Sequence, residues 1–197
     1  MRREALRLCD RYIDEVVLAF GLCPWASPSL RAGSVAREAV TRAAPVPADC
    51  LAAIDEWEAA EPAIAVGLLV IPRFAGGRAA FDTFAEGVRR ADRARRGAGA
   101  EAAFVVAAFH PAGPSQFVGP HQAVSFLRRS PDPMLQLVRA ELLAGVKAAG
   151  AGDDVSTGVA TRNHATLMAE GAKERFEVVI RALRADRDEA YARLGLL

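Results

Sequence analysis

Two runs of apolar residues set the strongest limits on how this chain can fold. Residues 63–71 and 102–109 are almost uninterrupted apolar stretches. Short runs of this kind are typical of strands that are buried on both faces of a sheet. Between them lies a helical pattern with Phe81, Phe84 and Val88 on its apolar face. Because strands alternate with helices, we predict an α/β or α+β layered domain.

The remaining segments extend this pattern. Residues 4–20 carry apolar residues at helical spacing, and residues 34–42 alternate and predict another strand. Pro133 is expected to open a further helix, and residues 155–159 to form a short strand or an ordered loop. We therefore expect a small central sheet of three to four strands, covered by helices, in a single domain spanning residues 1–197.

The composition narrows the class of protein. A formal net charge of +1 gives no global field that would favour nucleic acid or an anionic membrane surface as a partner. No apolar stretch has the length of a membrane span. Cys9, Cys23 and Cys50 are too few and too scattered for a disulfide framework, so we expect a cytoplasmic protein. The oligomeric state is not indicated.

The first candidate site combines Cys23 and His110. The strand predicted at 102–109 ends at His110, and a long loop rich in Pro, Gly and Ser is expected to follow over residues 112–134. Long loops after core strands are more often functional than structural. Cys23 lies between a helix end and a proline, where a thiol can be exposed. We expect Cys23 to act as nucleophile or ligand, and His110 as acid, base or ligand.

Structural roles for these residues remain open alternatives. Cys23 can be a buried small apolar residue, and His110 can hydrogen-bond a loop carbonyl. His121 is a candidate substrate contact, with a solvated loop residue as its alternative. No spacing of a known zinc motif is present. We predict no cofactor, although the Cys23-Pro24 pair leaves a haem or metal ion, bound by Cys23 or His110, as an alternative.

An anion site is predicted around Arg128 and Arg129. Both precede Ser130 and the helix start expected at Pro133. A helix start with neighbouring arginines binds carboxylate or phosphate. The alternative is that both arginines are solvated and the cap is ordinary.

A second, weaker anion candidate follows the first apolar run. Arg73 and Arg78 flank Gly76 and Gly77 there. The segment lacks the spacing of a P-loop or a dinucleotide fingerprint, so it does not predict nucleotide binding.

Four segments in order resemble a family of bacterial proteins known as DUF1415. They are Leu22-Cys-Pro-Trp-Ala26, Phe109-His-Pro111, Arg129-Ser-Pro-Asp-Pro-Met-Leu135 and Arg162-Asn163. In that family an LCPFA-like segment, an FHP segment, an RSPYPM-like segment and an RN pair recur in this order. The resemblance covers residues from about 5 to 165. It implies functional roles for Cys23, His110, Arg129, Ser130 and Asn163, and it supplies no mechanism.

The chain departs from the family pattern at three positions. Trp25 replaces the usual Phe, and Asp132 replaces the usual aromatic residue. Gln136 stands where a histidine is common, which weakens a role for an imidazole at that position.

We expect a small-molecule enzyme, of the kind used in specialised metabolism, that acts on an anionic substrate. Cys23 and His110 would carry the chemistry with Asn163 orienting a partner, and Arg128, Arg129, Ser130 and His121 would bind the substrate. One alternative is a metal- or haem-binding protein that uses Cys23 or His110. A second alternative is a protein-interaction module without catalysis.

Overall fold

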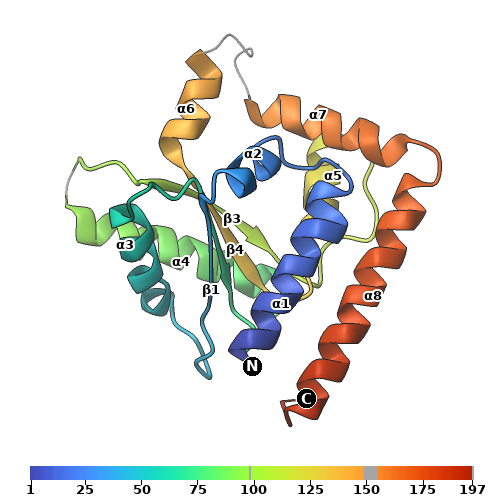
Figure 1. Cartoon of the computed structure of the whole chain (residues 1–197), viewed down its shortest axis with the longest axis horizontal. Helices are drawn as coiled ribbons and strands as arrows, with labels where there is room; N and C mark the ends of the chain where they lie inside the picture. Colours follow the sequence, from blue (N-terminus) through green and yellow to red (C-terminus); the bar gives the residue numbers. More distant parts are fainter. Residues whose placement is uncertain (98, 149–154, 197) are drawn as a thin grey trace.

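A four-stranded sheet with helices on both faces forms the centre of the computed structural model of this chain (Figure 1). The structure describes residues 1–97, 99–148 and 155–196. In chain order the elements are α1 (Arg2–Tyr12), the π-helix η1 (Ile13–Leu18), α2 (Ala26–Arg31), β1 (Val35–Ala39), the 3-10 helix η2 (Pro47–Cys50), α3 (Leu51–Ala59), β2 (Val66–Val70), α4 (Arg78–Arg96), β3 (Phe104–Phe109), α5 (Pro120–Leu127), β4 (Met134–Arg139), α6 (Ala140–Ala148), α7 (Val155–Met168) and α8 (Ala172–Arg193). The mixed α/β class and the small sheet of three to four strands are confirmed.

The strands lie in the order β1-β2-β4-β3. β1 and β2 are parallel, with Val35 opposite Val66, whereas β4 runs antiparallel to both of its neighbours. β2 and β4 are therefore central, and β1 and β3 are the edges. The central position of β2 explains why all five of its residues are buried, as its continuous apolar sequence predicts.

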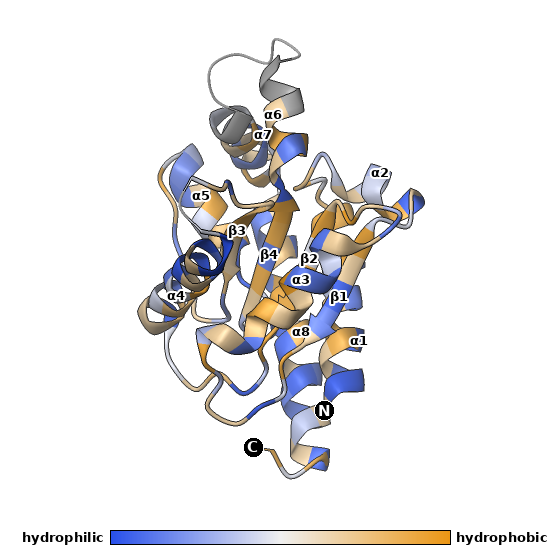
Figure 2. Cartoon of the chain, turned by 90° about the vertical axis from the view of Figure 1, so that its left-hand side faces the viewer, coloured by the Kyte–Doolittle hydropathy of each residue, from blue (hydrophilic) through white to orange (hydrophobic). Residues whose placement is uncertain are grey.

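Side chains that alternate along the strands divide the core into two clusters. Leu68 and Met134 belong to the first core cluster, which packs beneath α1, η1, α5, α7 and α8. Leu69 and Leu135 belong to the second core cluster, beneath α3 and α4. Figure 2 shows the apolar surfaces of the strands enclosed between these helices. Successive residues on a strand thus point to opposite faces of the sheet.

Three secondary-structure predictions were wrong. Residues 134–139 form strand β4, so no helix begins at Pro133. Because both faces of β4 are covered, Leu135 and Leu137 are buried on one side and Met134 on the other, which hides the alternation of a strand. The helical spacing farther along belongs to α6. The predicted long loop contains α5, and residues 155–159 lie in α7.

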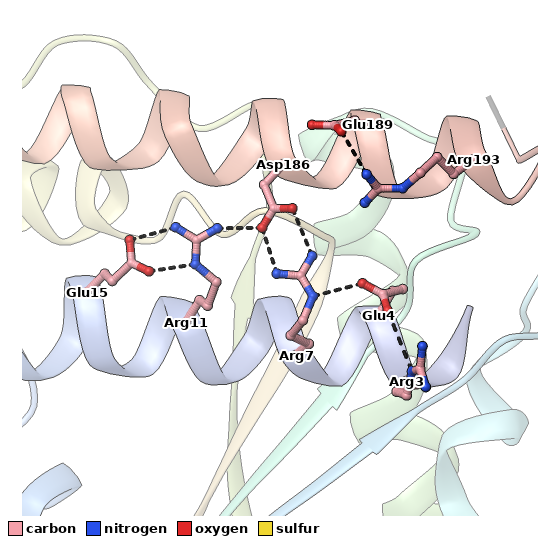
Figure 3. Close-up of polar contacts among 8 residues, drawn as sticks. All are labelled: Arg3, Glu4, Arg7, Arg11, Glu15, Asp186, Glu189 and Arg193. Carbon is pink, nitrogen blue, oxygen red and sulfur yellow. Dashed lines mark hydrogen bonds and ion pairs between the residues drawn. The ribbon is translucent and has the colours of Figure 1, made fainter.

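Helices α1 and α8 are joined by ion pairs on the outside of the molecule (Figure 3). Arg7 donates to both carboxylate oxygens of Asp186, at 2.7 and 2.8 Å, and Arg11 donates to the same carboxylate. Arg11 also pairs with Glu15 of η1, the segment that continues α1. Asp186 therefore fixes α8 along α1, which itself packs on the sheet.

Among the described residues, no helix is both long enough and apolar enough to cross a membrane.

Candidate functional site

Cys23 faces a cavity of about 40 Å³ between the sheet and the helices that cover its first core cluster. Every strand and three helical segments contribute to its wall. The lining residues are Tyr12, Ile13, Val17, Cys23, Ala26, Leu30, Val35, Val66, Leu68, Phe109, Met134 and Gln136. A space of this size holds about three water-sized groups. It therefore suits an apolar fragment of a few heavy atoms.

The π-helix η1 shapes one wall of this cavity. It continues α1 directly and contributes Ile13 and Val17 to the lining. π-Helices are rare and occur frequently at functional sites. The helix ends before Gly21, whose φ of 60° suits a glycine, and the chain then turns back to bring Cys23 to the cavity. The wide turn and the glycine together place the thiol over the sheet.

The surroundings of Cys23 favour the protonated form of its thiol. Burial raises its pKa, while hydrogen bonds from the backbone N–H groups of Trp25 and Ala26 lower it to a smaller extent. Cys9 and Cys50 are fully buried, and burial raises the pKa of each to about 12. Cys23 differs from both because it is only half-buried and lines a cavity. It is therefore the thiol to which a small molecule has access.

Gln136 and Tyr12 bring the other polar groups of the cavity wall. Gln136 lies at the middle of the central strand β4, opposite Leu68 on β2, and its amide can donate and accept hydrogen bonds. The hydroxyl of Tyr12 already donates to the carbonyl of Leu127, at 3.1 Å. Among the lining residues, only Cys23 and Tyr12 can titrate.

The structure does not bring His110 to Cys23. Phe109 lines the cavity beside Cys23, whereas the ring of His110 lies 5.7 Å from that of Phe81, a residue of the second core cluster. Since neighbouring residues at the end of a strand point to opposite faces, the two candidates occupy separate places. His110 is not among the residues that line the cavity, whereas Gln136 lines it together with Cys23.

His110 has a structural environment. Its Nδ1 accepts a hydrogen bond from the N–H of Ala112, at 3.0 Å, so the ring proton is on Nε2. Nε2 lies 3.1 Å from the carbonyl oxygen of Gly76 and donates to it. Burial lowers the pKa of His110, against the effect of the Gly76 bond. Both ring nitrogens therefore form hydrogen bonds within the protein, which favours the neutral imidazole. The contact with the Gly76 carbonyl agrees with the structural alternative, in which His110 hydrogen-bonds a loop carbonyl.

Of the two arginines in the predicted anion site, Arg129 is already paired within the protein. The guanidinium of Arg129 binds both carboxylate oxygens of Glu177, at 3.1 and 2.8 Å, and its Nε donates to the carbonyl of Phe126. Its carbon Cζ lies 4.0 Å from the centre of the Phe126 ring. Each of the three guanidinium nitrogens therefore already has a partner within the protein, and the charge is paired with a carboxylate. Moreover, residues after Pro133 form a strand, so the helix start predicted there is not present.

Ser130 and Asp132 belong to a buried network. The hydroxyl of Ser130 donates to the backbone carbonyl of Asp132. The carboxylate of Asp132 accepts hydrogen bonds from Arg187 and from the hydroxyl of Tyr191, each at 2.6 Å. Burial nevertheless raises the pKa of Asp132, although both donors lower it. These contacts attach the segment before β4 to α8.

The other predicted residues lie apart from the cavity lining. His121 is an exposed residue in the first turn of α5, and the half-buried Arg128 follows the last residue of that helix. The guanidinium carbon of Arg128 lies 5.7 Å from the centre of the Phe109 ring. Asn163 is buried in α7, and its Oδ1 has no hydrogen-bond partner among the described residues.

Within the described parts of the chain, no three His, Cys, Asp or Glu side chains gather into a group that could hold a metal ion. His110 is also not among the residues that line the cavity beside Cys23.

The sequence of the chain matches one protein-family model. The model described as "Protein of unknown function (DUF1415)" matches residues 4–177. The chain belongs to the DUF1415 family. No curated protein and no solved structure matches the chain. The resemblance of its four segments to DUF1415 is thus confirmed, and it extends from α1 into α8.

Sequence reasoning missed Gln136 and Phe109 as members of the DUF1415 cavity. Gln136 was assigned to a helix that does not exist, so its place on the central strand could not be inferred. Phe109 could have been found, because the period of two in residues 104–109 puts Phe109 and His110 on opposite faces. Had Cys23 been predicted to lie on the face of the sheet that Phe109 occupies, this alternation would have placed His110 on the opposite face from Cys23.

Proposed function

We propose that this protein is a small-molecule enzyme whose reacting group is the thiol of Cys23. The observation that carries the proposal is that Cys23, alone among the three cysteines, combines partial exposure with a cavity that also contains the amide of Gln136. In this role the cavity receives a small apolar part of the substrate. The anionic part expected from the sequence would lie outside the cavity wall, which carries no charged side chain.

The chemistry follows from the groups at hand. A thiolate is the nucleophilic form of cysteine, and burial raises the pKa of Cys23. No imidazole or carboxylate lines the cavity to take the proton. The proton therefore leaves to water or to a basic group of the substrate. Backbone N–H groups at Trp25 and Ala26 and the amide of Gln136 would then stabilise negative charge on sulfur or on a carbonyl oxygen.

The alternative functions have less support. Pockets for drug-sized ligands have volumes of about 300–1,000 Å³, far above the 40 Å³ beside Cys23, so a haem does not fit there. For an interaction module, the exposed large apolar residues that are described belong to different elements, among them Val46, Val105 and Met168. Scattered residues of this kind are normal on a surface. All three thiols are free, which supports a reducing, cytoplasmic setting for the proposed enzyme.

Alkylation kinetics test the proposal. The folded protein is treated with iodoacetamide at pH 7 to 9.5, and the modified cysteine is identified by peptide mass spectrometry. We expect one alkylation per chain at Cys23, with a rate that rises with pH as the thiol ionises. Cys23→Ser should abolish the label, and Cys50→Ser should leave it unchanged.

Turnover is tested separately with a panel of activated acyl compounds of about two to four carbons, the size that the cavity accepts. A transient acyl adduct on Cys23 together with product release supports an enzyme. The proposal is rejected if Cys23 reacts no faster than Cys9 and Cys50 in the folded protein. Stable labelling of Cys23 by every acyl compound, with no release, would instead favour a binding protein.

A further inference from the structure

Four arginines from three distant segments lie around the outer edge of β3 and the residues that follow it. Arg89 of α4 donates to the carbonyl of Val106, at 2.8 Å, and Arg184 of α8 donates to the carbonyl of Pro111. Arg128 receives the N–H of His110 on its own carbonyl, at 3.0 Å. The backbone after β3 thus gathers positive side chains.

Arg78 completes the set through His110. It is the first residue of α4 and follows Gly76, whose carbonyl accepts the bond from His110. The Nε of Arg78 lies 3.0 Å from both carboxylate oxygens of Asp82. Its NH1 atom is buried and has no hydrogen-bond partner among the described residues. The Nε of Arg78 is therefore paired with a carboxylate, while its NH1 is a donor without a partner among the described residues.

Arg128 has the least compensation. Within the described part of the chain, its side chain forms no ion pair, and its guanidinium lies over the ring of Phe109 instead. Burial is the main cause that lowers its pKa, and the positive charge of Arg78 lowers it further. Tyr12 and Asp82 raise it, and the positive charge of Arg89 lowers it by the smallest amount. A half-buried cation that is repelled by two others is unfavourable unless an anion joins them.

The nearby carboxylates do not remove this excess. Asp82 is already paired with Arg78, and Glu86 with Arg89. Both acidic side chains are about half exposed, at 50% and 51%, so water screens their charges. Of Arg78, Arg89 and Arg128, the first two thus have one screened carboxylate each, and Arg128 has none among the described residues. Arg184 adds a further positive charge, and it donates to the neutral carbonyl of Pro111.

We propose that Arg128 and Arg78, with Arg89 beside them, bind an oxyanion, either a phosphoryl or a carboxylate group. Guanidinium groups present paired donors that match both kinds of oxyanion. The first turn of the 19-residue helix α4, which begins at Arg78, adds free backbone N–H groups on the same side. This site keeps Arg128 from the anion site predicted around Arg128 and Arg129, but not Arg129, whose nitrogens already donate to Glu177 and Phe126.

The inference goes beyond the proposed enzyme and does not depend on it. Phe109 separates the two places, since its ring lines the Cys23 cavity and also contacts Arg128. An anion at Arg128 therefore lies one aromatic ring away from the thiol. If both proposals hold, a substrate with an apolar fragment and an oxyanion would extend past Phe109.

Calorimetric titration with inorganic phosphate, and in parallel with acetate, tests the site at constant ionic strength. We expect saturable binding of at least one of the two anions to the wild-type protein. Arg128→Gln and Arg78→Gln should each weaken it at least tenfold. Arg90→Gln, which removes an exposed arginine of the same helix, should change affinity less than twofold. Phosphate binding alone assigns a phosphoryl site, and acetate binding alone a carboxylate site.

Thermal unfolding of each variant shows whether weaker anion binding comes from a folding defect. Because Arg128 is repelled by its neighbours, Arg128→Gln should melt no lower than the wild type without added anion, and phosphate should no longer raise its melting temperature. The proposal is overturned if neither anion binds saturably, or if the Arg128 and Arg78 variants bind like Arg90→Gln. Alkylation of Cys23 by iodoacetamide, measured on the same variants, reports on the proposed enzyme site separately.

Discussion

The carbonyl oxygen of Gly76 lies 3.1 Å from Nε2 of His110 and accepts a hydrogen bond from it, so one imidazole joins the segment before α4 to the end of β3. The same ring accepts the N–H of Ala112. Two backbone groups that would otherwise lack partners depend on this side chain. His110 therefore organises the backbone around the proposed oxyanion site without binding the anion.

His110→Ala should lower the free energy of unfolding by about 1–3 kcal/mol, because it removes the hydrogen bonds to the Gly76 carbonyl and from the Ala112 N–H, each worth about 0.5–1.5 kcal/mol. The folded pKa of His110 is below its unfolded value of about 6.5. Its contribution is therefore complete above pH 6.5 and is lost as pH falls through the folded pKa. Urea unfolding at pH 5 to 8 checks both points. His121→Ala, at an exposed position, should retain the wild-type pH dependence; an unchanged profile in His110→Ala would contradict the assignment.

Gln136→His should activate Cys23. The substitution places an imidazole in the wall of the cavity that the thiol lines, and a neighbouring imidazole lowers the pKa of a thiol and accepts its proton. We expect iodoacetamide to alkylate Cys23 at least several-fold faster at pH 7 than in the wild type. Gln136→Asn keeps an amide and should not accelerate alkylation. Equal rates in all three proteins would show that residue 136 does not reach the sulfur.

The two tyrosines of the chain offer a matched comparison of hydrogen bonds. Both are 2% exposed, but Tyr191 donates to the carboxylate of Asp132 and Tyr12 to the neutral carbonyl of Leu127. Tyr191→Phe should cost about 1.5–3 kcal/mol and Tyr12→Phe about 0.5–1.5 kcal/mol, because a bond to a charged group is stronger. Chemical denaturation measures both. A larger loss for Tyr12→Phe would mean that Asp132 is not ionised in the folded protein.

Asp186→Asn should weaken the attachment of α8 to α1. The variant keeps the shape of the side chain but loses the charge that Arg7 and Arg11 share, with an expected cost of about 1 kcal/mol after allowance for solvent screening. Hydrogen bonds from Arg7 are the main cause that lowers the pKa of Asp186. Its contribution is therefore present above the unfolded pKa of about 3.9 and lost as pH falls through the folded value.

Glu189→Gln is the control for Asp186→Asn. Glu189 pairs with Arg193 on the exposed side of α8, where 70% of its side chain is accessible (Figure 3). Its loss should change the free energy of unfolding by a few tenths of a kcal/mol at most. Thermal unfolding at pH 7 in low and high salt compares the two variants, and equal effects would argue against a special role for Asp186.

The sequence was most informative where burial imposes one pattern. The apolar run at 63–71 predicted β2 because a central strand with both faces covered has no polar positions. The same condition misled the prediction at β4, where Met134, Leu135 and Leu137 are all buried and follow a proline that suits a helix start. Local sequence does not distinguish these two outcomes. Pairing with β2 and β3, which decides between them, is a long-range property.

The candidate site was predictable only in part. Cys23 could be selected from its place after a helix end, and the structure gives it a cavity. The partners of Arg129 and Asp132 could not be inferred, because Glu177, Arg187 and Tyr191 lie 48 to 59 residues farther along the chain. Charged pairs at such separations have no local signature. As a result, Arg129 was assigned to a ligand although a carboxylate of α8 already occupies it.

The buried carboxylate of Asp132 also has a consequence for the order of events during synthesis. Its partners, Arg187 and Tyr191, follow it by 55 and 59 residues. At about 5–20 residues per second, translation supplies them roughly 3 to 12 seconds after Asp132 itself. During that interval the segment leading into β4, the strand between β2 and β3, carries an acidic group that has no partner to accompany it into the core. The centre of the sheet is therefore completed late, once the ribosome has delivered the last turns of α8.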